Sequence, residues 1–70
     1  MKIEAINPSK WQAVVNRFVS QNERYKWFIS MGKDETLTCH LAHERALIAW
    51  NKLTKREQKN IGKHIDTTGY

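Results

Sequence analysis

The sequence predicts a small α+β domain with a short N-terminal strand, one amphipathic helix, a β-hairpin and two C-terminal helices, in that order. Two stripes of apolar residues at helical spacing and one region of alternating residues lead to this prediction. The alternating region, residues 23–41, decides the fold class, because a helical conformation there would give an all-α three-helix domain. In either case the 70 residues form a single domain, residues 1–70.

Residues 42–63 carry the clearest pattern. Thr54, followed three residues later by Glu57, is a capping-box pattern. It predicts that one helix ends near Leu53 and that another begins with Thr54 as its N-cap. The apolar stripe of the helix before it consists of Ala42, Ala46, Ala49, Trp50 and Leu53.

Two elements are predicted upstream. Residues 1–6 alternate apolar and charged side chains, which suits a short N-terminal strand or a frayed tail. Asn7-Pro8 predicts a helix start, because Asn is a preferred N-cap and Pro suits the first helical position. The amphipathic stripe of this helix consists of Trp11, Val14, Val15, Phe18 and Val19.

Residues 23–41 are compatible with two conformations. In the first, two alternating strands flank a polar turn at residues 32–35 and form a hairpin. In the second, heptad spacing extends the first helix to Met31, with Gly32 as its C-cap. We favour the hairpin, because consecutive Trp27-Phe28-Ile29 would leave a lone helix apolar nearly all round. The polar tail, residues 66–70, is expected to be flexible.

One short stretch resembles a known family. Leu37-Thr38 and the run from Trp50 to Gln58 are similar to the junction between the second and third helices of HMG-box DNA-binding domains. The resemblance is confined to residues 37–58. The basic opening segment of that family is missing, the interval from Pro8 to Leu37 is too long, and Gly62 shortens the third helix. We therefore do not assign the chain to the family.

The charge of the chain favours a polyanionic partner. Twelve Lys and Arg residues against seven Asp and Glu residues give a net charge of +5. The single cysteine excludes an internal disulfide, and no apolar run is long enough to span a membrane. Nothing at the N-terminus resembles a signal peptide. We expect a cytoplasmic monomer or small homo-oligomer.

No catalytic or metal-binding set is complete. Cys39, His40, His43 and His64 provide only fragments of a zinc site, and Cys39 has no complete set of partners for nucleophilic catalysis. The carboxylates of Asp34, Glu35, Glu44 and Glu57 are expected to be solvated surface acids. No glycine-rich loop could hold a phosphate. We expect a protein without enzymatic activity, cofactor or metal.

A basic face is the main candidate for function. Five cations in the last third of the chain, three of them spaced four residues apart, indicate a helical surface for DNA or RNA. If all five contacted phosphates, the logarithm of the binding constant would fall with the logarithm of salt with a slope of about −4.5 on duplex DNA. These residues are Lys52, Lys55, Arg56, Lys59 and Lys63.

An aromatic surface is the alternative. Aromatic residues next to basic ones could stack on bases or bind a protein. In the second case the chain would be a modulator, of the kind that phages or mobile elements encode, that inhibits a host protein or a nucleoprotein machine. The residues concerned are Arg24, Tyr25, Lys26, Trp27 and Phe28.

Overall fold

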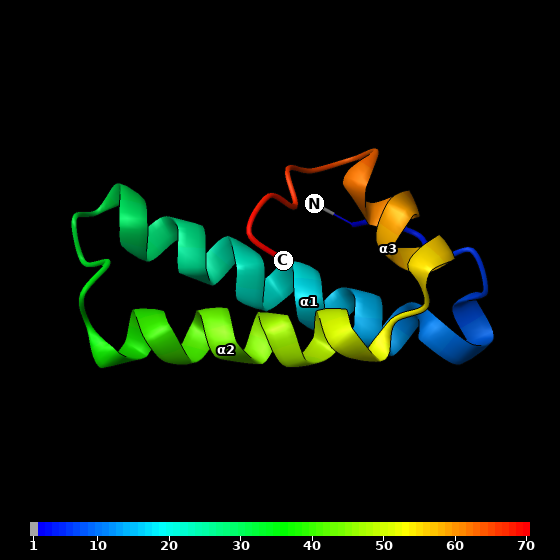
Figure 1. The fold of residues 1–70 in the computed structure, drawn as a ribbon, viewed down its shortest axis with the longest axis horizontal. Helices are drawn as coiled ribbons and strands as arrows, with labels where there is room; N and C mark the ends of the chain where they lie inside the picture. The colour runs from blue at the N-terminus through cyan, green and yellow to red at the C-terminus, as the bar shows by residue number, and fades with distance from the viewer. Residues whose placement is uncertain (1) are drawn as a thin grey trace.

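Three α-helices make up the fold of residues 2–70. The computed structural model describes residues 2–70 and contains α1 (Pro8–Ser30), α2 (Leu37–Lys52) and α3 (Lys55–Gly62). No strand occurs in this range, so the α+β prediction is wrong and the all-α alternative describes the chain. Figure 1 shows α1 and α2 side by side and antiparallel, with α3 and both terminal segments on one side of the pair.

The predicted hairpin is wrong because residues 23–30 continue α1. The small residues of α2 that are buried, Cys39, Ala42, Ala46 and Ala49, allow α2 to approach α1 closely along this length. On α1, Tyr25 faces α2 and its ring lies 4.6 Å from that of His43. The helix does not need to bury every apolar residue, since Trp27 stays 52% exposed.

The turn between α1 and α2 explains why α1 stops where it does. Gly32 adopts a φ of 72°, a left-handed conformation that glycine tolerates best. The N–H groups of Gly32 and Lys33 then donate to the carbonyls of Ile29 and Phe28, at 3.0 and 2.8 Å. This pair of bonds is the Schellman motif of helix C-termini.

The predicted N-terminal strand is also wrong, although its alternation is meaningful. Met1 lies outside the described residues, residues 2–5 form no regular secondary structure, and a bend follows at residues 6–7. Ile3 and Ala5 are buried, as a period of two implies. Side chains satisfy the backbone instead: Gln12 accepts from the Ala5 N–H at 2.9 Å and donates to the Ile3 carbonyl at 2.8 Å.

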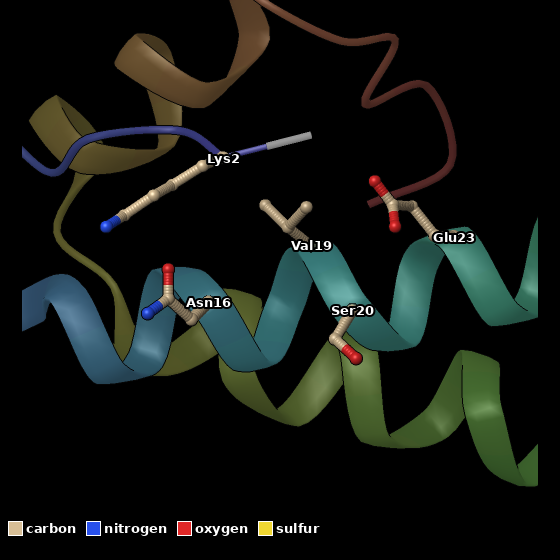
Figure 2. Close-up of a pocket in the computed structure, with 5 residues that line it drawn as sticks. All are labelled: Lys2, Asn16, Val19, Ser20 and Glu23. Carbon is tan, nitrogen blue, oxygen red and sulfur yellow. The ribbon is translucent and has the colours of Figure 1, made fainter.

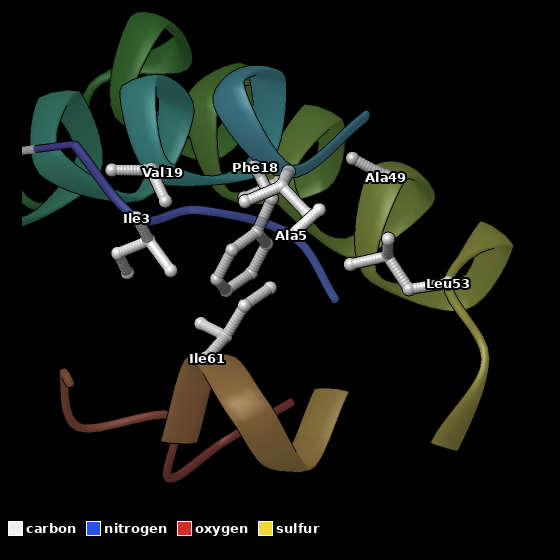
Figure 3. Close-up of a cluster of buried hydrophobic side chains, with 9 residues drawn as sticks. Ile3, Ala5, Phe18, Val19, Ala49, Leu53 and Ile61 are labelled. Atoms are coloured by element: carbon white, nitrogen blue, oxygen red, sulfur yellow. The ribbon is translucent and has the colours of Figure 1, made fainter. Parts of the chain in front are cut away.

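The core lies between the α1–α2 pair, α3 and the N-terminal segment, as Figure 3 shows. Phe18 is fully buried, and its ring centroid lies 4.9 Å from those of both Trp50 and Tyr70. Ile61 is the buried apolar contribution of α3. The core thus depends on residues far apart in sequence.

Tyr70 is the last residue of the segment that is expected to be flexible. Its hydroxyl donates to the Asn22 side-chain oxygen at 2.8 Å. Burial, with a smaller contribution from Tyr25, raises the pKa of Tyr70 to about 12. The phenol is therefore protonated at neutral pH and available as a hydrogen-bond donor.

Two glycine substitutions should have opposite effects. Gly32→Ala places a Cβ on a left-handed residue and should lower the free energy of unfolding by about 1 kcal/mol. Gly62→Ala, in α3, introduces only an ordinary 3.5 Å contact with the Thr67 hydroxyl and should raise it by about 0.5 kcal/mol. Urea unfolding followed by circular dichroism measures both. An unchanged stability of Gly32→Ala would contradict the helix end described above.

Candidate nucleic-acid interface

The start of α3 is fixed by Thr54, as predicted. The Thr54 hydroxyl accepts from the Glu57 N–H at 3.3 Å. The reciprocal bond of a capping box, from the Thr54 N–H to the Glu57 carboxylate, does not form among the described residues. The Glu57 carboxylate accepts instead from the N–H groups of Ile6 and Asn7. Glu57 is only 2% exposed, so the prediction that it is a solvated surface acid is also wrong.

A second contact fixes α3 against the end of α2. The Gln58 side-chain amide donates to the Trp50 carbonyl at 2.8 Å and to the Leu53 carbonyl at 3.5 Å. Carbonyls at a helix C-terminus have no partner within the helix, and this amide supplies one. Because Glu57 and Ile61 are buried on the inner side of α3, the residues on the opposite side point to solvent.

Three of the predicted cations gather on one surface. Lys55, Lys59 and Lys63, here called the α3 lysine row, line the same open depression. All three side chains are exposed. The other residues that line the depression are uncharged: Trp50, Gln58, Gly62 and Thr67. Sequence reasoning assigned Trp50 to the core and missed Gln58, although Gln58 follows Lys55 by three residues and shares its helical face.

The other two predicted cations lie elsewhere. Arg56 lines a hollow with Trp11 and the N-terminal end of α1. Lys52 lines a groove between α1 and α2. Both are exposed, and none of the five cations forms an ion pair with a carboxylate among residues 2–70. The five residues therefore form one row of three and two separate cations.

Part of the predicted aromatic surface is also brought together. Trp27 and Phe28 meet edge to face at 5.0 Å. The Arg24 guanidinium lies 5.7 Å from the centre of the Phe28 ring, and the Lys33 ammonium lies 6.0 Å from that of Trp27. Arg24, Trp27, Phe28 and Lys33 are here called the aromatic tip. Sequence reasoning gave no indication of Lys33, whose ammonium lies near Trp27 because the chain reverses at the left-handed Gly32.

Tyr25 and Lys26 do not belong to this tip. The Tyr25 ring is half-buried against His43 of α2, because a helix turns consecutive residues about 100° apart. Lys26 lies in an exposed position and contributes to the field at Asp66. Hydrogen bonds from Thr68, with a smaller contribution from Lys26, hold the pKa of Asp66 below its usual value.

The residues considered for metal or thiol chemistry are dispersed. Cys39 is fully buried, and the His43 ring packs against Tyr25 and Tyr70. His40 and His64 are exposed. Within residues 2–70, no three side chains of the types His, Cys, Asp and Glu gather closely enough to hold a metal ion.

A further hollow lies between the N-terminal segment and α1 (Figure 2). Its lining includes Lys2 at one end and Glu23 at the other, with Asn16, Val19 and Ser20 between them. The mixed charge favours a polyanion less than the α3 lysine row does.

A functional proposal for this chain has to rest on the geometry of its surface, because comparisons with known proteins identify no relative. No protein family, no curated protein and no solved structure matches the chain. None of the helices within residues 2–70 combines the length and the apolar content that crossing a membrane requires.

Proposed function

We propose that this protein binds the phosphate backbone of nucleic acid through the α3 lysine row. The observation that supports this proposal best is that three exposed lysines line one depression whose other lining residues carry no charge. Lysines at this spacing repel one another mildly, and phosphates would relieve that repulsion. The net charge of +5 adds long-range attraction.

The length of the α3 lysine row suits a short stretch of the nucleic-acid backbone. Lys55 and Lys63 are separated by about 12 Å along the helix axis, given a rise of about 1.5 Å per residue. That length matches the axial rise of three to four phosphates on one DNA strand. The Gln58 amide is occupied by the carbonyls of Trp50 and Leu53. Binding should therefore depend on phosphates and not on base sequence.

Reversing one charge of the row tests the proposal. Lys59→Glu should weaken binding to a random-sequence duplex of about 20 base pairs by roughly tenfold, because it removes one phosphate contact and adds repulsion. The fold should be kept, since the introduced carboxylate would face Lys55 and Lys63 one turn away on either side. Fluorescence anisotropy measures the affinity. With three contacts, the wild-type salt slope should be about −2.7.

Lys33→Glu is the matched control, because it makes the same change in net charge at the other end of the molecule. It should change the affinity by less than about twofold. Equal losses in the two variants would show that only net charge matters, and the α3 lysine row would then have no special role.

A second candidate function is binding of a protein partner through the aromatic tip. It is favoured by one observation: Trp27 remains 52% exposed even though its ring packs against that of Phe28. Trp, Tyr and Arg are enriched among the residues that dominate binding energy at protein interfaces. A modulator that inhibits a host enzyme or a nucleoprotein machine would use such a surface.

Affinity purification separates the two candidates. If the aromatic tip binds a protein, a tagged copy should retain the same partner from nuclease-treated lysate when it carries Lys59→Glu, and should lose it when it carries Trp27→Ala. Trp27 is exposed, so this truncation should leave the helical fold intact. Retention of the partner by both variants would contradict a role for the tip.

A further inference from the structure

The groove between α1 and α2 is a further surface, which combines an apolar lining with basic residues. Its floor and walls are apolar, from Ala13 and Val14 of α1 and from Ile48 and Ala49 of α2. Arg17 lies on one rim and Lys52 on the other. Among the residues that the structure describes, no acid lines the groove. The nearest acid in sequence to the lining residues of α2 is Glu44, one helical turn before Ile48 and outside the lining.

This groove faces away from α3. Arg17 and Val19 are two residues apart on α1, so their side chains point about 200° apart, and the same holds for Ile48 and Trp50 on α2. Val19 belongs to the core on the α3 side, and Trp50 packs against that core. Arg17 and Ile48 therefore point to the opposite side of the pair, where Ile48 remains 51% exposed.

The α1 rim continues beyond the groove as a cationic stripe. Lys10 precedes Arg17 by seven residues and Arg24 follows it by seven, so the three share one helical face. On α2, Arg45 lies three residues before Ile48 and adds a cation near the other wall. All four are exposed. Cations of both helices thus lie beside the apolar floor, and Glu44, four residues before Ile48, places one acid on the same side of α2.

We propose that this groove docks an acidic amphipathic helix of a partner protein. The groove has a volume of about 160 Å³. A cavity of about 150 Å³ accommodates a benzene-sized group, so one large apolar side chain fits here. Carboxylates that flank this side chain on the two sides of the docked helix would lie near Arg17 on one rim and Lys52 on the other. Apolar anchors at helical spacing, flanked by charges that complement the rim, are the recognition mode of a helix in a groove.

Other occupants fit the groove less well. A second copy of this chain would bring the same cations against the rim and repel it. Nucleic acid could contact the rim, but the apolar floor would face a polar backbone. A bilayer presents a plane, whereas Ala49 at the floor is only 2% exposed and lies recessed between the helices.

Selection of peptides tests the proposal while the partner itself is unidentified. A phage-displayed library of random peptides of about 16 residues, roughly 24 Å as a helix, is selected on the wild-type protein and counter-selected on Ile48→Glu. Ile48 is half exposed, so this variant should keep the fold, as circular dichroism can verify. Enriched peptides should carry a net negative charge and apolar residues at helical spacing.

The matched variants locate the binding site. The best synthetic peptide should bind Arg17→Glu about tenfold more weakly than wild type, and should bind Lys59→Glu, with the same change in net charge, within about twofold. The proposal is overturned if no peptide is enriched, if enriched peptides carry no excess of acids, or if both variants lose affinity equally. It is also overturned if a DNA duplex or phosphatidylserine vesicles, and not the peptide, shift the amide resonances of residues 13–17 and 48–52.

Discussion

The Glu57 carboxylate determines how the small third helix is placed. It is buried, and it accepts hydrogen bonds from two consecutive N–H groups at the start of the chain. Burying an ionised carboxylate without donors would be costly, so these bonds are what allow Glu57 to face inward. Because α3 has only eight residues and could not hold itself together by propensity alone, this inward anchor decides which of its residues face solvent.

The anchor and two neighbouring contacts link the N-terminal segment and the end of α2 to the surface proposed for phosphate binding. Glu57 bonds to the N-terminal segment, Gln58 bonds to the end of α2, and Asn60 donates to the Glu4 carbonyl at 2.9 Å. Glu57 lies on the inner side of α3, and Gln58 and Asn60 flank it on the two edges of the helix. Lys55 and Lys59 are left on the outer side, where no acid of residues 2–70 neutralises them.

Sequence reasoning found the features that depend on local chemistry. Thr54 is an N-cap and Pro8 begins a helix because these preferences act within one helical turn. The alternation of residues 2–6 correctly indicated which side chains are buried, although no strand forms. A period of two is typical of a segment with one covered face, and here Gln12 of α1 and Asn60 of α3 bond to backbone groups that a sheet would otherwise pair.

The errors arose where distant contacts override local pattern. Residues 23–41 alternate as a hairpin would, but packing of α1 on the small residues of α2 favours helices there. Trp27 stays exposed to solvent as a result. The partner of Glu57 lies fifty positions away and has no local signal. Distant contacts also separate the five predicted cations. The packing of the helices places Lys52 and Arg56 at other hollows than the α3 lysine row.

The central claim is that α3 presents a row of lysines to a polyanion. A nitrogen-15 NMR titration of the wild-type protein with a random-sequence duplex tests it most directly. We expect the largest amide shifts to fall in residues 55–63 and to decrease as salt is added. Shifts concentrated in residues 24–33, or no shifts at low salt, would contradict it.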